Sequence, residues 1–544
     1  MSAKSHEIEL VVLRKTVHTR RGWCLALLAL FATAWSVAAT ISLTGGYSPT
    51  VHDEFSNLLA GDTLLKGRIA NEAPEFWEPF QTFHVIMEPS YASKYPLAGG
   101  AIVALGRLTV GMPIAGNWFV AGLAAVCFAW MLAGATSRLW AFFGGLIVAL
   151  HPTLQVVWSQ NLFAAWWTAA AACLIAGGML RLRRRASVPD GCWTGVGIGL
   201  IALSRPFEGL VFTCCCFLGL WFFMARRGIH ERLNRIATAG MGAAPPMFFC
   251  LTLIAWQNYS TTGSVLEMPY QVHEARYGVA PVFIFQQPIE STATNVPAVF
   301  SKFHEGWSLD CFRSRQGWTG WVQGISIAVA QIGGLVGLLG IAILYASMSF
   351  LKTRVGSFAL LALAMQVFAA AAVCWIFPHY LVPAVVWGLF MTVLALRRLA
   401  HRFQASRVVV PVGIAVQFAL LIVAAWAYCA EPKPEWAQRR VDLLDALSGM
   451  RGKHMVVVNY DESHNVHQEW VYNGADLEQA KIIWAHGSNP EWTRKLLENY
   501  GTTRTLWHLN PDADFQLELV STPKKSASAK SVFVHRKVAD STPE

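Results

Sequence analysis

The sequence predicts a polytopic α-helical membrane protein with about eleven transmembrane helices and a small soluble α/β domain at its C-terminal end. Of its 544 residues, 54% are hydrophobic and only 14% are charged, whereas a soluble globular domain carries about 25% charged residues. Apolar runs recur from residue 23 to residue 428, and the pattern then changes to short strand-like pieces. This composition excludes a soluble enzyme, a disordered protein and a fibrous protein.

The formal net charge of +10 comes from 43 Lys and Arg against 33 Asp and Glu. The segments that we expect on the cytoplasmic side carry 20 of these bases and only four acids, so the rest of the chain is net acidic. An excess of Lys and Arg in cytoplasmic loops is typical of membrane proteins. The basic balance therefore indicates orientation, with residues 1–22 in the cytoplasm, and does not imply nucleic acid as a partner.

The predicted transmembrane domain spans 23–428. Its first apolar run, 23–43, is interpreted as an uncleaved anchor, and a signal peptide is the alternative because Ser36-Val37-Ala38 resembles a cleavage site. Residues 96–180 hold four apolar pieces where an odd number of crossings is needed, so we expect 96–112 to dip into the membrane without crossing. The other expected crossings are 116–135, 139–157, 160–180, 192–204, 206–225, 237–256, 325–348, 357–377, 379–396 and 408–428.

This orientation places two long loops, 44–95 and 257–322, and the C-terminal region on the outer face of the membrane. Residues 429–525 are expected to form a small periplasmic α/β domain, and residues 526–544 a flexible tail. The expected strands are Met455–Val458, Lys481–Ala485, Arg504–Leu509 and Phe515–Val520, with a helix at Glu491–Asn499.

His52, Asp53 and Glu54 follow the first crossing within a few residues. A charged group close to hydrocarbon is costly and is often functional. ATP and sugar nucleotides are cytoplasmic, so the donor available at the outer face is an activated lipid. A carboxylate in this position is suited to accept the proton of an attacking hydroxyl, with His52 as a candidate contact for the acceptor. The alternative is that Asp53 only caps the helix that follows.

Lys94 and Tyr95 precede Pro96 at the start of the next apolar piece. Lys94 is placed to hold a lipid phosphate as a point charge, or else to snorkel towards the headgroups. Pro96 suits the start of a helix, where its missing N–H is not needed. Glu88 and Tyr95 are further candidates for contact with the acceptor.

Two later turns carry cationic or aromatic groups on the outer side. Arg205 stands between two apolar halves and is suited to a bidentate grip on phosphate, and an internal ion pair within the turn, which also holds Glu208, is the alternative. His379 and Tyr380 stand at another such turn, either as contacts for phosphate or acceptor or as packing partners.

The sequence contains several groups of potential metal ligands. The later outer loop opens with Asn258, a candidate acceptor contact, and contains His273 and Glu274 without a recognised ligand spacing, so a structured lid is the preferred interpretation. His464 and His467 lie three residues apart, as zinc ligands can, but no further ligand follows at an obvious spacing. The eleven cysteines show neither a disulfide framework nor zinc spacing. We therefore assign no metal site from the sequence.

Taken together, these features resemble the GT-C glycosyltransferases, the polytopic enzymes that include protein O-mannosyltransferases and the lipid A aminoarabinose transferase. The resemblance covers most of residues 20–400 and rests on the order of its motifs. In chain order these are Asp53-Glu54, Lys94-Tyr95-Pro96, Arg205-Pro206, an Asn followed by Thr-Gly-Ser, and His379-Tyr380. The chain departs from the family in two places: the Pro-Pro of many relatives is Pro96-Leu97 here, and the stretch 151–161 lacks their second acid.

The resemblance implies an inverting transfer of a sugar from a polyprenyl-phosphate donor to a hydroxyl of a lipid, glycan or protein acceptor. Asp53 would be the base, and Glu54 would support it. Lys94, Arg205 and His379 would stabilise the departing phosphate, because fixed positive charge favours developing negative charge. No organic cofactor follows from the resemblance, and the missing second acid leaves open whether a divalent cation takes part.

The sequence thus predicts a glycosyltransferase of the bacterial inner membrane, with a cytoplasmic N-terminus and an active site that faces the periplasm. Its partners would be the polyprenyl-phosphate sugar, the acceptor and the membrane lipids. A lipid-linked glycan transporter or flippase is one alternative, although the predicted crossings are poor in the polar residues that a transport path needs. A membrane-anchored assembly protein that works through residues 430–544 is the other.

Overall fold

The computed structural model of the chain describes residues 24–39, 47–337, 340, 352–402, 406–431, 434–513, 515 and 517–523. The expected cytoplasmic segment 1–22 and the expected tail 526–544 lie outside these residues. Parts of the expected crossings 23–43 and 325–348 lie outside them as well.

Within the described residues, eight helices are long and apolar enough to cross a membrane. A ninth span results if the bent pair α5 (Arg138–Leu150) and α6 (Pro152–Ser159), which meet at 56°, is one crossing. The eight are α4 (Ala115–Ala133), α7 (Ala165–Leu182), α9 (Pro206–Phe223), α10 (Ile229–Thr262), α14 (Gly317–Val336), α16 (Arg354–Ala371), α17 (Val382–Arg402) and α18 (Ser406–Ala430).

The count of eight or nine refers to the described residues, and two of the eleven predicted crossings correspond there to shorter helices. Residues 192–204 belong to α8 (Val188–Ala202), whose 15 residues rise about 22 Å, less than the roughly 30 Å of the hydrocarbon core. The first apolar run, 23–43, contributes the described helix Cys24–Ala39, and the rest of this run lies outside the described residues. Both runs remain predicted crossings.

The helices differ in how deeply they lie within the bundle. α7 and α17 are 89% and 83% buried over their apolar windows, whereas α18 is only 17% buried. Large apolar side chains such as Trp426 on α18 are exposed, as is usual for a helix that faces lipid. The inner helices therefore form the core, and the outer ones present an apolar surface.

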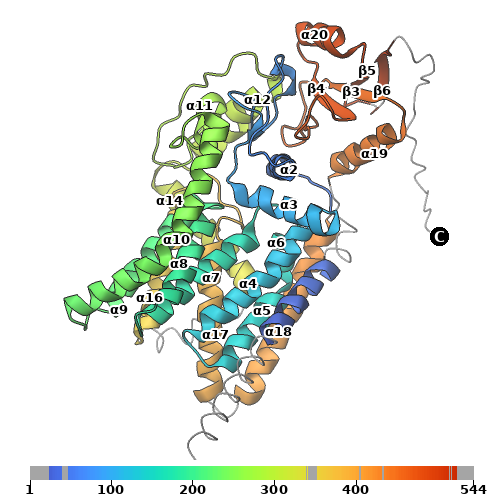
Figure 1. The fold of residues 1–544 in the computed structure, drawn as a ribbon. Coiled ribbons are helices and arrows are strands. Elements are labelled where there is room, and N and C mark those ends of the chain that lie inside the picture. Colours follow the sequence, from blue (N-terminus) through green and yellow to red (C-terminus); the bar gives the residue numbers. More distant parts are fainter. Residues whose placement is uncertain are drawn as a thin grey trace, which may run out of the picture.

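Helix α3 (Leu97–Val110) has 14 residues, too few for a crossing, as expected for the segment 96–112. It lies across one end of the bundle, next to α2 (His52–Leu65) (Figure 1). Gly100 allows the close approach, because a Cβ there would lie 2.7 Å from the Cβ of Ala60 and 3.0 Å from its carbonyl carbon. This contact fixes α2, which carries the acidic pair, over the end of the bundle.

Short elements gather at the same end as α2 (Figure 1). They are η1 (Glu78–Phe80), the antiparallel strands β1 (Val85–Ile86) and β2 (Ala92–Ser93), α11 (Pro269–Tyr277), α12 (Ala298–Ser301), the π-helical turn η2 (Lys302–Ser308) and α13 (Leu309–Ser314). The loop before α11 begins at Gly263, later than the expected residue 257, because α10 continues past its internal Pro245 and Pro246 and ends at this glycine, which has a φ of +81°.

The C-terminal region forms a four-stranded sheet with two helices, α19 (Glu435–Gly449) and α20 (Pro490–Tyr500). The strand order is β4-β3-β5-β6, in which β3 (Lys453–Val458) pairs in parallel with β4 (Ile482–His486) and β5 (Arg504–Leu509). β6 (Leu517–Ser521) is antiparallel to β5. All four strands lie where the sequence pattern placed them, and the unit sits at the α2 end of the bundle (Figure 1).

Candidate active site

A cavity of ≈ 360 Å³ lies where α2, the loop 81–96, α11, η2 and the C-terminal unit meet. Its lining joins segments that are more than 400 residues apart in the sequence. The residues that line it are Val51, His52, Asp53, His84, Lys94, Tyr95, Tyr270, Glu274, Phe303, His304, Trp307, Ser308, Trp375, Phe377, Tyr380 and His467.

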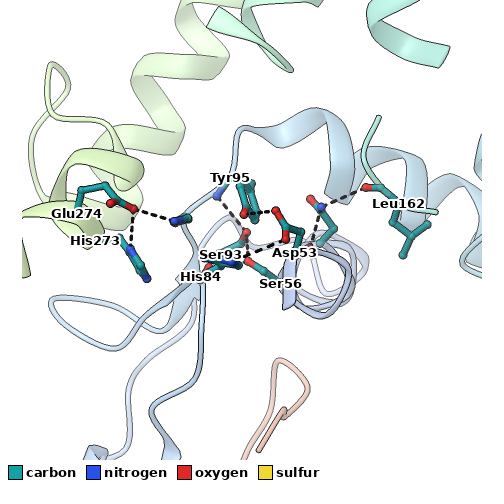
Figure 2. A network of polar contacts seen from close by, with 10 residues as sticks. Asp53, Ser56, His84, Ser93, Tyr95, Leu162, His273 and Glu274 are labelled. Carbon is teal, nitrogen blue, oxygen red and sulfur yellow. Dashed lines mark hydrogen bonds and ion pairs between the residues drawn. The ribbon is translucent and has the colours of Figure 1, made fainter. Parts of the chain in front are cut away.

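Asp53 lies in the first turn of α2 and faces this cavity, with 32% of its side chain exposed. The Tyr95 hydroxyl donates a hydrogen bond to Oδ1 of Asp53, and Nε2 of His84 lies 3.8 Å from Oδ2 (Figure 2). Asn57 braces the helix by donating to the carbonyls of Asp53 and Leu162. The carboxylate is therefore oriented from two sides and still accessible to a ligand.

His84 owes its position to an uncommon backbone conformation, with a φ of +62°. Its carbonyl accepts hydrogen bonds from the Ser56 hydroxyl at 2.6 Å and from the Lys94 N–H at 3.1 Å. Residues held in such conformations are frequent at functional sites. The turn before β1 thus directs His84 towards Asp53 (Figure 2), and the His84 carbonyl links Lys94 to Ser56 of α2.

Glu54, the second member of the acidic pair, does not line the cavity. It is 2% exposed and accepts hydrogen bonds from the Tyr47 hydroxyl at 3.0 Å and the Thr50 N–H at 2.9 Å. Burial raises the pKa of Glu54 to about 7, against the opposing effect of these hydrogen bonds. Its place in the structure is at the entry to α2.

Lys94 is 5% exposed and donates from Nζ to Oε1 of Glu274 at 2.8 Å, and Figure 2 shows this glutamate beside His273. Its ammonium lies 4.7 Å from the ring centroid of Tyr270. Burial would raise the pKa of Glu274, but Lys94 and the hydrogen bond from His273, 3.2 Å away, bring it well below the usual range. Lys94 is consequently a fixed cation that borders the cavity.

Arg205 and His379 do not line the cavity: Arg205 contacts the lining residue Tyr380, and His379 contacts Tyr380 and Phe377. The guanidinium carbon of Arg205 lies 4.5 Å from the Tyr380 ring centroid, and its Nη2 donates to the carbonyl of Phe163 at 3.4 Å. His379 packs on Phe163, with the ring centroids 4.2 Å apart, and burial and then Arg205 lower its pKa. The predicted turn residues therefore form a second layer behind Tyr380.

Of the remaining predicted contacts, some line the cavity and others lie outside it. His52 lines the cavity and stacks on Phe83 at 4.3 Å, and burial lowers its pKa to about 3. Glu88 points to the surface and pairs with Arg276 at 2.8 Å. Asn258 donates to the carbonyl of Val265 at 3.0 Å and so closes the end of α10. Glu88 and Asn258 are not part of the cavity wall.

Several lining residues were not predicted from the sequence. They are His84, Tyr270, Phe303, His304, Trp307, Ser308, Trp375, Phe377 and His467 as a cavity residue. Most of them lie in loops whose approach to α2 depends on tertiary contacts, so no spacing signals them. The one available signal was the composition of the segment from His273 to Trp307, which is rich in aromatic residues and histidine for an outer loop.

The two C-terminal histidines have different surroundings. Nδ1 of His464 lies 2.7 Å from Asp512, and its ring stacks on Tyr460 at 3.8 Å. His467 instead lies over Trp307, with the ring centroids 4.7 Å apart. Among the residues that the structure describes, no group of three or more His, Cys, Asp or Glu is placed to hold a metal ion.

This fold, a bundle of long apolar helices with shorter segments gathered at one end, is similar to that of a solved structure. The structure of ArnT from Cupriavidus metallidurans bound to undecaprenyl phosphate aligns with a TM-score of 0.51, 12% identity and coverage of 90% of this chain and 93% of that one. The Archaeoglobus fulgidus oligosaccharyltransferase in complex with Zn and sulfate aligns with a TM-score of 0.49, 12% identity and coverage of 89% and 67%. No protein-family model and no curated protein matches the sequence.

Proposed function

We propose that the chain is an inverting glycosyltransferase that moves a sugar from a polyprenyl-phosphate donor to a hydroxyl acceptor at the outer face of the bacterial inner membrane. The observation that carries the proposal is an accessible, oriented carboxylate, Asp53, that shares a cavity with the buried cation Lys94. A base and a fixed positive charge are the two groups that such a transfer needs.

Asp53 accepts the proton of the acceptor hydroxyl as its oxygen attacks the anomeric carbon of the donor sugar. The bond from that carbon to the phosphate oxygen breaks on the opposite side, its electron pair stays with the phosphate, and the anomeric configuration inverts. Lys94 stabilises the charge that develops on the phosphate, and Arg205 supports it from behind Tyr380. No covalent intermediate with the protein forms.

The basic clusters support the proposed orientation. Arg181, Arg227 and Arg398 lie at or near the ends of α7, α9 and α17 that are remote from the ends bearing Arg205 and Tyr380. An excess of bases is expected on the cytoplasmic side, which leaves the cavity on the periplasmic side. A nucleotide-free, lipid-linked donor is consistent with that location.

The test compares purified wild type with Asp53→Asn, using labelled short-chain polyprenyl-phosphate sugars and a membrane extract as the acceptor pool. Because a general base contributes about 100- to 10,000-fold, the variant should lose at least about 100-fold in rate. Asp62→Asn is the matched control, since Asp62 lies on the same helix but pairs with Arg107 away from the cavity. Full activity of Asp53→Asn would reject the base assignment.

The same assay tests the metal and the alternatives. Asp53 and Lys94 supply the base and the counter-charge, so we expect EDTA to leave the rate unchanged. A loss of rate on EDTA that Mg²⁺ or Mn²⁺ restores would show that a divalent cation takes part. Absence of transfer by wild type with every donor and cation would instead favour a transporter or an assembly protein.

A further inference from the structure

The π-helical turn η2 builds one wall of the cavity. Phe303, His304, Trp307 and Ser308 all line the cavity from this turn. In a helix with i to i+5 hydrogen bonds, residues four or five apart share a face, so these four side chains project together. Such turns are rare and frequently lie at functional sites. The turn is therefore a candidate for ligand contact.

Four residues of the lining contribute buried ring nitrogens without a hydrogen-bond partner. These are Nε2 of His52, Nδ1 of His84, Nε2 of His304 and Nε1 of Trp375. Most buried polar atoms in folded proteins have a partner, so four exceptions around one cavity need an explanation. A ligand that both donates and accepts hydrogen bonds would supply the missing partners.

The wall formed by His52 and η2 is uncharged. Burial lowers the pKa of His52 and of His304 to about 3, so both imidazoles are neutral at pH 7. A neutral imidazole has one donor and one acceptor nitrogen, which matches the two roles of a hydroxyl group. The charged lining residues Asp53, Lys94 and Glu274 lie on other segments, and Lys94 pairs with Glu274, so the side chains that line the cavity from His52 and η2 carry no charge.

Size and shape restrict the ligand further. The cavity of ≈ 360 Å³ is near the lower end of the range of about 300 to 1,000 Å³ for small-molecule sites, which suits one sugar ring and not an oligosaccharide. The rings of Phe303 and Trp307, with centroids 4.9 Å apart, offer apolar surfaces for the C–H face of a sugar. His467 of the C-terminal unit covers Trp307.

We propose that His52, His304 and Trp307 form a subsite for a single uncharged, hydroxyl-rich sugar ring. The inference rests on the proposed function and specifies its substrate class: a neutral monosaccharide and not an amino sugar, a uronic acid or an oligosaccharide. The ring belongs either to the lipid-linked donor or to a glycan acceptor. Both sources present the same hydroxyl groups to the histidines.

The test measures equilibrium binding of three probes to the full-length protein: bare polyprenyl phosphate, the same lipid carrying a neutral hexose, and a free methyl hexoside. For a donor subsite, wild type should bind the hexose-bearing lipid at least about 10-fold more tightly than the bare lipid, which corresponds to about 1.4 kcal/mol. His304→Phe, which keeps the ring size, should remove this difference while the affinity for bare lipid stays the same. His304→Gln, which keeps a donor and an acceptor, should restore part of it.

A control variant and the three probes distinguish a donor subsite, an acceptor subsite and the absence of a subsite. His508→Phe changes a histidine outside the cavity and should bind every probe like wild type. If the subsite binds the acceptor, His304→Phe should weaken the binding of the methyl hexoside. The preference for the hexose-bearing lipid over the bare lipid should then stay as in wild type. Unchanged binding of all probes to both His304→Phe and His52→Phe would overturn the subsite. Tighter binding of wild type to the same lipid carrying an amino sugar or a uronic acid, measured as a fourth and a fifth probe, than to the hexose-bearing lipid would also overturn it.

The two proposals fail in different ways. If wild type binds neither lipid probe, the proposed donor is wrong, and the methyl hexoside arm still decides whether the histidines bind a sugar. If wild type transfers sugar but the histidine variants bind and react like wild type, the subsite is wrong and the transferase stands.

Discussion

Asp53 and Glu54 are neighbours in the sequence with opposite environments. Asp53 faces the cavity and is partly exposed, whereas Glu54 is buried and burial raises its pKa to about 7. Pairs of titratable groups whose surroundings differ in this way usually have different roles. The exposed carboxylate is suited to take a proton from a ligand, and the buried one is suited to hold the start of α2.

Replacing Glu54 with Gln should therefore affect stability more than chemistry. The folded state holds the proton on Glu54 more tightly than the unfolded state, so the stability that it contributes is lost as pH rises from about 4.5 to about 7. Glu54→Gln does not lose stability in this way. The Tm of the variant minus the Tm of wild type should therefore be about 2 °C or more higher at pH 8 than at pH 5. Thermal unfolding at the two pH values measures the difference.

The activity of the same variant provides the second half of the test. Transfer by Glu54→Gln should stay within about 10-fold of wild type, far above the loss of about 100-fold or more expected for a general base. An equal loss of rate in Glu54→Gln and Asp53→Asn would contradict the division of roles. A Tm difference that does not change with pH would contradict the buried, protonated state of Glu54.

The sequence identified part of the cavity at the level of single residues. Asp53, Lys94 and Tyr380 could be predicted because charged or aromatic groups next to apolar runs lie at the membrane surface. The same rule selected Glu88, which faces solvent, since it does not show to which side a turn directs a side chain. His304 could not be predicted, because its position depends on the packing of η2.

At the scale of elements, the site depends on how closely α2 approaches α3. A Cβ on Gly100 would lie within 3.2 Å of the backbone nitrogen of Gly61 and 2.7 Å from Ala60 Cβ. Neither neighbour has a long side chain that can move aside. The pair of helices is therefore held at a distance that only glycine permits, and this distance sets the depth of Asp53 in the site.

Gly100→Ala should push α2 away from α3. Overpacking of this kind costs about 1 to 3 kcal/mol, and a displacement of about 1 Å at a reacting group can cost about 100-fold in rate. Gly240→Ala is the matched control, because a Cβ on Gly240 in α10 meets no atom within 4 Å. Transfer assays and thermal unfolding of both variants measure the effect. A fully active Gly100→Ala protein would show that the contact does not position Asp53.

Hydropathy predicted most of the long helices but not all of their limits. α10 continues to Thr262 because length and apolarity do not end a helix, whereas Gly263 with its positive φ does. The predicted crossing 192–204 corresponds to α8, which begins earlier, at Val188, and ends at Ala202. Lengths of single elements depend on capping and packing, which hydropathy does not measure.

At the scale of the whole molecule, the C-terminal unit is part of the site. Tyr472 stacks on Phe55 of α2 with ring centroids 4.0 Å apart and planes within 3°. Arg440 donates to the carbonyls of Trp470 and Tyr472 and thereby fixes that loop. The strands of the C-terminal unit were predictable from short apolar runs. The docking of the unit was not, because Tyr472 and its partner Phe55 lie some 400 residues apart in the sequence. Segments from both ends of the chain therefore build the cavity.

Tyr472→Ala should lower transfer by about 10-fold, because the loop that carries it also carries His467 and braces the helix of Asp53. Phe55→Ala should give a similar loss, since it removes the other ring of the same stacked pair, and such pairs contribute about 0.5 to 1.5 kcal/mol beyond their buried area. The double variant should then lose little more than either single variant, as expected for residues that act through one contact. Rates and Tm values of the four proteins complete the cycle.

Multiplicative losses in the double variant, or full activity of Tyr472→Ala, would mean that the C-terminal unit does not act on the site through this stack. Leu519→Ala, on the exposed part of β6, controls for a general effect of changes in the C-terminal unit and should leave transfer unchanged.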